Sequence, residues 1–152
     1  MREQILSREQ RIPRSAQETF AFFADARNLE AITPPWLRFR VVKTDPSAMA
    51  AGTHIAYRLR LHGVRLRWLT RIEVWEPDRR FVDRQLSGPY RLWHHIHEFE
   101  PAGIRATIMR DRVRYAIGFG PLGDLALSLF VRRDVEAIFD YRAGRITALL
   151  GG

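Results

Sequence analysis

Three of the five histidines in the chain fall within one short segment, residues 93–99, with the sequence WHHIHEF. Because successive side chains of a β-strand point to opposite faces, a strand here would place Trp93, His95, His97 and Phe99 on the same face. Imidazole groups among aromatic rings can line a pocket for a mostly apolar ligand, whose orientation a few polar groups fix. The segment therefore predicts a cavity for a small molecule.

A hairpin on each side of this segment would bring further polar side chains to the same face. Asp83 and Gln85 would lie near it across one turn. Met109 or Asp111 would stand opposite His95 across the other turn. The predicted cluster therefore combines imidazole, carboxylate and amide groups.

Two interpretations of this cluster stay open. In the first, His95 or His97 anchors a ligand or acts as a general base, and Asp111 fixes the imidazole tautomer and supports its protonated form. The catalytic candidates are then His95, His97 and Asp111. In the second, the same residues form a buried polar network that satisfies itself and maintains the strand register.

Other kinds of site have weaker support. Two histidines two residues apart on a strand can ligate a metal ion together with Asp83 or Asp111, but the further ligands of cupin-like sites are missing. Residues 118–123 spell G-x-G-x-x-G, but no parallel strand with a ribose-binding acid follows. These glycines are predicted to form a turn, and neither a metal nor a cofactor is expected.

The composition limits the partners. The 152 residues, 46% of them hydrophobic, are enough for one domain spanning residues 1–152, and the net charge is +8. A basic chain can attract nucleic acid or an anionic membrane. Every basic residue except Lys43 is an arginine, however, and the arginines are scattered along the chain. This pattern indicates a solvated basic exterior, so nucleic acid is not expected as a partner.

The location is also constrained. The chain contains no cysteine, which excludes disulfides and thiol catalysis. Its first residues lack the apolar core of a signal peptide, and no run of about 18 apolar residues occurs. A cytoplasmic location is therefore expected.

Helices and a first strand are predicted before the histidine segment. Residues 4–12 have the pattern of a strand. A helix follows, with Ser15 and Glu18 as its capping box. A shorter helical turn comes next, which Pro34-Pro35 must end because proline cannot continue a helix.

In the remainder of the chain, a strand periodicity is followed by a helical one. Between residues 37 and 117 apolar and polar residues alternate, which predicts six antiparallel strands joined by short turns. From about residue 120 to 149 the period is helical, which predicts one helix of over 25 residues. The apolar concave face of a curved sheet must be covered, and this helix is the available cover. A gap between the two would be a cavity.

The alternation also assigns individual side chains to faces. Leu37 belongs to the second predicted strand and points inward. Trp68 has the inward parity and Trp75 the outward one.

Several short motifs in this order of elements resemble the START-like SRPBCC superfamily, which has the helix-grip fold. They are Gly52-Thr53, Arg67-Trp68, Phe81-Val82-Asp83-Arg84-Gln85, Gly88-Pro89-Tyr90, Trp93-x-His95-x-His97-x-Phe99, Asp111-x-Val113-x-Tyr115 and Phe119-Gly120. The superfamily includes the birch pollen allergen, polyketide cyclases and lipid-transfer START domains. The resemblance covers the whole chain and implies an α+β fold: a seven-stranded curved antiparallel sheet wrapped around a long C-terminal helix, with two short helices between strands 1 and 2. It also implies a deep hydrophobic pocket, but it brings no fixed catalytic set.

The expected function is to bind a small hydrophobic or aromatic ligand in an internal cavity and to carry or sense it. The expected ligand-binding residues are Tyr57, Trp68, Gln85, Trp93, His95, His97, Phe99, Asp111, Val113 and Tyr115.

Two alternatives remain. One is a cyclase, dehydratase or hydrolase that uses His95 or His97 with Asp111 or Tyr115 as acid and base. The other is a lipid or quinone chaperone that contacts anionic membranes through its arginines. The sequence does not reveal the ligand or the oligomeric state.

Overall fold

The computed structural model describes residues 3–44, 49–118 and 120–151, without the side chains of 120–128. Its elements follow the order that the periodicity predicts. They are β1 (Gln4–Ile12), α1 (Ala16–Ala24), α2 (Asn28–Ile32), η1 (Pro35–Leu37), β2 (Arg40–Thr44), β3 (His54–Leu61), β4 (Val64–Glu76), β5 (Arg80–Ser87), β6 (Leu92–Pro101), β7 (Thr107–Ala116) and α3 (Gly120–Leu150).

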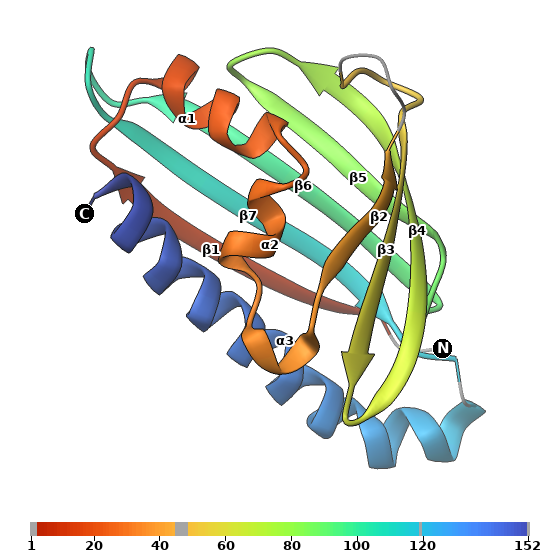
Figure 1. Cartoon of the computed structure of the whole chain (residues 1–152). Coiled ribbons are helices and arrows are strands. Elements are labelled where there is room, and N and C mark those ends of the chain that lie inside the picture. Colours follow the sequence, from red (N-terminus) through yellow and green to blue (C-terminus); the bar gives the residue numbers. More distant parts are fainter. Residues whose placement is uncertain (1–2, 45–48, 119, 152) are drawn as a thin grey trace.

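The strands form one antiparallel sheet in the order β1-β7-β6-β5-β4-β3-β2. Strands β2 to β7 follow one another as neighbours, and β1 pairs with β7 at the far edge. The sheet curls so that β2 to β4 stand across from α3, while α1 and α2 lie over the same concave side (Figure 1). The helix-grip α+β prediction is confirmed.

The helix α1 begins at the predicted capping box. The backbone N–H of Glu18 donates to Oγ of Ser15 at 3.1 Å, which satisfies one donor of the first turn. Its apolar face then places Phe20 and Phe23 in the core, where Phe20 meets the ring of Phe99 edge-on at 5.3 Å. The helix thus closes one end of the sheet.

The strand expected from Leu37 begins later. Pro35, Trp36 and Leu37 form the short 3₁₀ helix η1, and Arg38 after it has a positive φ of 46°. This left-handed residue ends the turn, so β2 starts at Arg40. Leu37 is still buried, as predicted, but it belongs to η1.

The outward prediction for Trp75 is wrong. The pairing of β4 with β5 shifts by one residue between Ile72 and Val74, and such a bulge reverses the parity of everything after it. Trp75 consequently packs inward, with its ring 5.0 Å from that of Phe20. Trp68, before the bulge, points inward as predicted and packs against Trp93.

The helix α3 covers the sheet with one stripe of side chains. At ~1.5 Å per residue its 31 residues reach across the whole sheet. Four of its described side chains are buried, at the helical spacing of four, three and four residues: Val135, Phe139, Arg142 and Ile146. Among the described residues, no helix is long and apolar enough to span a membrane.

Candidate functional site

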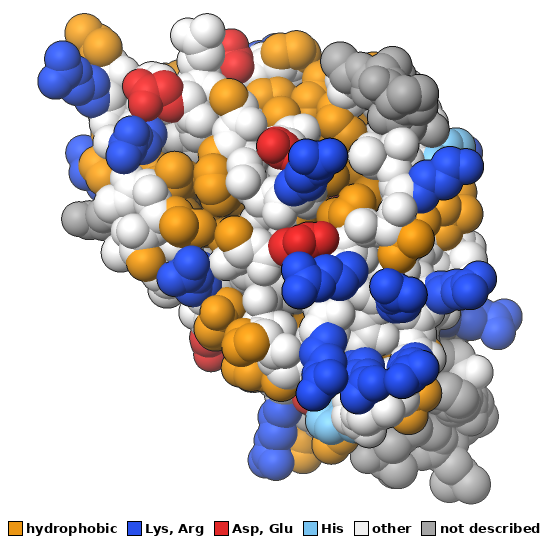
Figure 2. Space-filling view, in the orientation of Figure 1, with side chains coloured by type: hydrophobic (Ala, Val, Ile, Leu, Met, Phe, Trp, Pro, Cys, Tyr) orange, Lys and Arg blue, Asp and Glu red, His pale blue; other side chains and the backbone are white. Residues whose placement is uncertain are grey.

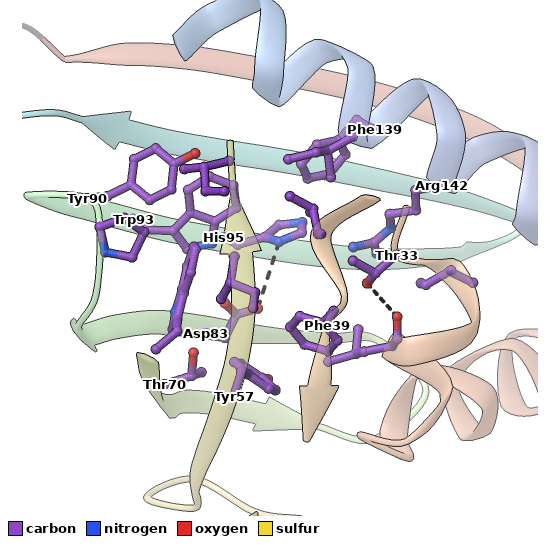
Figure 3. Close-up of a pocket in the computed structure, with 18 of the residues that line it drawn as sticks. Thr33, Phe39, Tyr57, Thr70, Asp83, Tyr90, Trp93, His95, Phe139 and Arg142 are labelled. Carbon is purple, nitrogen blue, oxygen red and sulfur yellow. Dashed lines mark hydrogen bonds and ion pairs between the residues drawn. The ribbon is translucent and has the colours of Figure 1, made fainter. Parts of the chain in front are cut away.

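A partly open cavity of about 140 Å³ lies between the concave face of the sheet and the helices (Figure 3). Apolar and aromatic side chains from α2, η1, β3, β4, β6 and α3 form most of its wall. These are Leu29, Ile32, Leu37, Phe39, Tyr57, Leu59, Leu61, Trp68, Pro89, Tyr90, Trp93, Ile138 and Phe139. The polar part of the wall is Thr33, Thr70, Asp83, His95, His97 and Arg142. The cavity therefore has an apolar body and one concentrated polar patch.

The two imidazoles of the polar patch lie face to face. The ring centroids of His95 and His97 are 3.5 Å apart, and Phe81 stacks on the other side of His97 at 4.0 Å. Both rings point inward because the strand alternation puts positions 95 and 97 on the concave face, where they are 3% and 2% exposed. The inward prediction for both histidines is confirmed.

Each imidazole is bonded to a different carboxylate. Nε2 of His95 lies 2.7 Å from Oδ1 of Asp111, and Nε2 of His97 lies 2.6 Å from Oδ2 of Asp83. Nδ1 of His95 is 3.8 Å from the same oxygen of Asp83, and this approach is drawn in Figure 3. One carboxylate thus stands in the cavity wall and the other behind it.

Arg142 of α3 joins this network from the opposite side. Its Nη2 donates to Oδ1 of Asp111 at 3.3 Å and lies 3.5 Å from Nδ1 of His97. Its guanidinium sits 5.4 Å from the ring centroids of both Phe23 and Phe139, in the range of cation–π attraction. A permanent positive charge is therefore buried next to the histidines.

These contacts assign the protonation of the network. Because a guanidinium only donates, Nδ1 of His97 accepts from Arg142, and its Nε2–H then donates to Asp83. Burial, with the nearby His95 and Arg142 as further causes, lowers the pKa of His97 well below 6.5. Burial raises the pKa of Asp83, and the nearby His95 and Arg142 oppose this effect only in part. The pKa values of the two bonded groups are thus shifted in opposite directions.

Asp111 shows the opposite balance. Burial by itself raises the pKa of this carboxyl, but the Arg142 guanidinium and the hydrogen bond from His95 together hold it well below its usual range. Asp111 is therefore ionised and fixes His95 as the tautomer with hydrogen on Nε2. Nδ1 of His95 is left as an acceptor on the side of Asp83.

Two tyrosines of the wall are neutral at physiological pH. Burial raises the pKa of Tyr57, and the negative charge of Asp83 adds to that effect. Burial likewise raises the pKa of Tyr90, together with Asp134. Both phenols can donate hydrogen bonds to a ligand but cannot act as bases.

Among the buried polar atoms that have no hydrogen-bond partner in the described residues, two belong to the cavity wall: Nε1 of Trp68 and Nε of Arg142. Both side chains line the cavity. A buried donor without a partner costs free energy, so an acceptor in the cavity would be stabilised there.

The structure brings half of the expected ligand-binding residues to the cavity wall. Tyr57, Trp68, Trp93, His95 and His97 line it. The other five, which lie elsewhere, are Gln85, Phe99, Asp111, Val113 and Tyr115.

These five have contacts of their own. Gln85 bonds both backbone groups of Tyr90, and Phe99 packs in the core beside Phe20. Asp111 supports His95 from behind. Val113 is fully buried in the second core cluster, and the hydroxyl of Tyr115 donates to Oε1 of Gln4 at 3.2 Å.

The predicted register across the β6–β7 turn, with Met109 or Asp111 opposite His95, was wrong by four or two residues respectively. Asp111 stands opposite His97, and Val113 stands opposite His95. The Asp111 carboxylate nevertheless reaches diagonally to His95, so the expected pairing of these two side chains exists. Asp83 was expected near this segment, and it stands directly opposite His95.

Sequence reasoning missed Arg142. A signal for it was present, because Arg142 continues the apolar stripe of α3 between Phe139 and Ile146. A charge on that stripe must be buried when the helix packs on the sheet, and a buried charge needs a partner. Asp111 is that partner.

Asp83, His95 and His97 also form a group of potential metal ligands, with ligand atoms within 4.8 Å of one another. Each histidine Nε2 is already bonded to a carboxylate, and Arg142 places its positive charge beside His97. A divalent cation would have to break these bonds next to a like charge. The donor set therefore favours a hydrogen-bonded network over a metal centre.

The family described as polyketide cyclase / dehydrase and lipid transport matches residues 12–140. This range contains β2 to β7, both short helices and most of α3. The chain belongs to this family. The resemblance to START-like SRPBCC proteins is thereby confirmed. The description of the polyketide cyclase / dehydrase and lipid transport family covers both catalysis and transport, so membership does not choose between them.

Solved structures with the same architecture cover almost the whole chain. One is a START superfamily protein from Mycobacterium smegmatis, 12% identical over 95% of this chain and 98% of its own, with a TM-score of 0.71. The ZhuI aromatase/cyclase from Streptomyces sp. R1128 is 17% identical over 99% and 93%, with a TM-score of 0.68. TTHA0849 from Thermus thermophilus is 21% identical over 96% and 99%, with a TM-score of 0.67. At these identities the likeness shows the fold. A search among curated protein sequences finds no significant match.

Proposed function

We propose that the protein binds a small, mainly aromatic molecule in the cavity between the sheet and α3, and carries or senses it. One observation carries this proposal: the cavity combines aromatic walls with a buried Trp68 Nε1 that has no partner among the described residues. A pocket of this kind holds a ligand by apolar contact and orients it by a few polar groups.

The size of the cavity supports a ligand with one aromatic ring inside. An engineered protein cavity of about 150 Å³ binds benzene, and the cavity here has about 140 Å³. Because it is partly open, a longer molecule could place one ring inside and extend outward. Names of structural neighbours such as aromatase/cyclase are consistent with aromatic ligands but belong to those proteins.

Titration with N-phenyl-1-naphthylamine tests the proposal, since the emission of this uncharged dye rises in apolar surroundings. We expect saturable binding to the native protein. The variant Ile138→Trp should abolish it, because Ile138 lines the cavity and a larger side chain fills the space. The matched control is Ile5→Trp, at an exposed position of β1, which should leave binding unchanged.

Native mass spectrometry of the purified protein complements the titration. A co-purifying small molecule that is lost in Ile138→Trp but kept in Ile5→Trp would support the same cavity. Dye binding that survives in Ile138→Trp would place the ligand elsewhere and contradict the proposal.

A second candidate function is acid–base catalysis of the cyclase, dehydratase or hydrolase type. It is favoured by the hydrogen bond between Asp83 and His97, which places a carboxyl group and an imidazole side by side in the cavity wall. His95 is a further candidate base, because Asp111 orients it with Nδ1 free to accept. Tyr115 is less suited, since its hydroxyl is directed to Gln4.

The variants His95→Ala and His97→Ala distinguish the two functions. A binding protein loses affinity in both variants but shows no turnover before or after the change. An enzyme shows a pH-dependent rate that disappears with the histidines. The assay uses aromatic ketones and polyketide-like substrates that displace the dye.

A further inference from the structure

An arginine groove of about 600 Å³ adjoins the cavity on the outside of the protein. Five arginines line it: Arg38, Arg40, Arg58, Arg60 and Arg65. Blue side chains gather on this face over the strands β2 to β4 (Figure 2). Positive charge is therefore concentrated around the groove.

The arginine groove and the cavity are continuous. Thr33, Phe39 and Leu59 line both. The strand β2 pairs with β3 only as far as Arg58, so the following residues of β3 have no strand on that side, and η1 lies beside them. This interruption at the edge of the sheet is where cavity and groove meet.

Most of the charge in the arginine groove is uncompensated. Arg40 forms an ion pair with Glu30 at 3.3 Å. For Arg38, Arg58, Arg60 and Arg65, the described part of the chain provides no carboxylate within ion-pair distance. Among the described residues, four of the five arginines that line the groove thus lack an ion-pair partner, and Glu30 is the one carboxylate in its lining.

The register of the strands increases this repulsion. Arg58 stands between Arg40 of β2 and Arg67 of β4, and Arg60 stands opposite Arg65. Like charges directly opposite on neighbouring strands destabilise a sheet. The fold thus tolerates a cost at this place that a bound anion would remove.

The opposite edge of the same sheet is arranged differently. There, Arg110 of β7 bonds Glu9 and Glu100, and Arg114 bonds Glu3. These two arginines are neutralised by carboxylates from neighbouring strands or from the end of one. The groove differs from these two positions because it gathers several arginines without such partners around one hollow.

We propose that the arginine groove binds the anionic group of an amphipathic ligand whose apolar part occupies the cavity. This proposal rests on the proposed function and adds the ligand's class: an aromatic or alkyl body with a terminal carboxylate, phosphate or sulfate. Guanidinium groups suit such anions because they donate paired hydrogen bonds to two oxygens. The apolar part of the ligand supplies affinity in the cavity. The anionic group stays in the arginine groove and so determines which end of the ligand enters the cavity.

The experiment compares 8-phenyloctanoate with its uncharged isostere 8-phenyloctanamide, both as competitors of N-phenyl-1-naphthylamine. The acid should bind about five- to tenfold more tightly than the amide at low salt, and the preference should shrink as salt screens the arginines. The double variant Arg60→Gln, Arg65→Gln should lose the preference while still binding the uncharged dye. It should also fold normally, because it removes two opposed like charges.

The matched control is Arg112→Gln, an exposed arginine on β7 away from the groove, which should keep the preference for the acid. Equal binding of acid and amide to the native protein would overturn the proposal and leave the cavity function intact. Failure of the dye itself to bind would reject the cavity function, and this proposal with it. Binding to phosphatidylglycerol vesicles that depends on Arg60 and Arg65, without a preference for the acid, would assign the arginine groove to a membrane surface and also overturn the proposal.

Discussion

Nη2 of Arg142 lies 3.3 Å from Oδ1 of Asp111 inside the protein, and this ion pair ties α3 to β7. The two side chains are 10% and 9% exposed. Their charges also determine the state of the neighbouring imidazoles, because Arg142 bonds His97 while Asp111 bonds His95. The helix that covers the cavity is thus held by the same residues that organise its polar wall.

Removing one partner of this pair should be costly. We expect Arg142→Met to lower the free energy of unfolding by about 3–5 kcal/mol, since Asp111 would remain as an uncompensated buried charge. Adding Asp111→Asn should recover part of that loss, because the amide oxygen can still accept from His95. Urea denaturation of the two single variants and the double variant measures this. Additive losses would contradict a direct interaction between the two residues.

The sequence predicted the order of elements because burial on one face imposes a period on the side chains. Strand alternation placed His95 and His97 in the interior, and helical spacing identified α3. Both signals are local. They depend on which face a residue occupies, and not on contacts with distant parts of the chain.

Features of the fold that depend on contacts between distant parts of the chain could not be predicted from these local periodicities. The bulge that turns Trp75 inward arises from the pairing of β4 with β5 and has no marker in the alternation. The register that sets Asp111 opposite His97 depends on the length of the connection between β6 and β7, which takes in more residues than a tight turn. The cavity itself is what remains after α3 and η1 have packed, so only half of the expected ligand-binding residues line it.

The buried neutral state of His97 should make stability depend on pH. Its pKa in the folded protein is below the ordinary value of 6.5, so the unfolded chain binds more protons than the folded one as the pH falls below 6.5. The contribution of His97 to stability is therefore complete above pH 6.5 and is lost on acidification, by up to about 1.4 kcal/mol per pH unit. The raised pKa of Asp83 has the opposite effect on stability. Above about pH 4 the folded protein binds more protons at Asp83 than the unfolded chain does, so this group lowers the stability as the pH rises.

The effect of His97 is measured as the difference in stability between the native protein and a variant without this histidine. Urea denaturation of the native protein and of His97→Gln at pH 7.5 and 5.5 should show the difference in stability between them shrinking at the lower pH. His94→Gln, which lies on the other face of the same strand, should keep the pH response of the native protein because His97 is still present. A constant difference between native protein and His97→Gln would show that His97 takes up no proton on unfolding.

The unpartnered Nε1–H of Trp68 leads to a prediction about ligand choice. Trp68→Phe removes this donor and keeps an aromatic ring, so we expect the stability to change by less than about 1 kcal/mol. Affinity for the ketone 6-propionyl-2-(dimethylamino)naphthalene should fall about three- to tenfold, because its carbonyl oxygen can accept from Trp68. N-phenyl-1-naphthylamine, which has no oxygen, should bind almost as before. The control is Trp75→Phe, since Trp75 does not line the cavity; equal losses for ketone and dye would argue against the hydrogen bond.

The turn beside the cavity should depend on Gln85 and Gly88 together. The Gln85 amide accepts from the backbone N–H of Tyr90 and donates to its carbonyl, so it holds the turn from which Tyr90 enters the cavity wall. A Cβ at position 88 would come 2.6 Å from Oε1 of Gln85 and displace this amide. We expect Gly88→Ala to lower the free energy of unfolding by about 1–3 kcal/mol through the two lost hydrogen bonds.

A double-mutant cycle separates this structural role of Gln85 from the ligand-binding role expected of it from the sequence. In a Gln85→Ala background the amide is already gone, so adding Gly88→Ala should cost less than about 0.5 kcal/mol. Dye affinity should fall equally in Gly88→Ala and Gln85→Ala, because both act by releasing Tyr90 from the wall. If Gln85→Ala weakened binding while Gly88→Ala did not, Gln85 would contact the ligand directly, and the hydrogen bonds to Tyr90 would not be its main function.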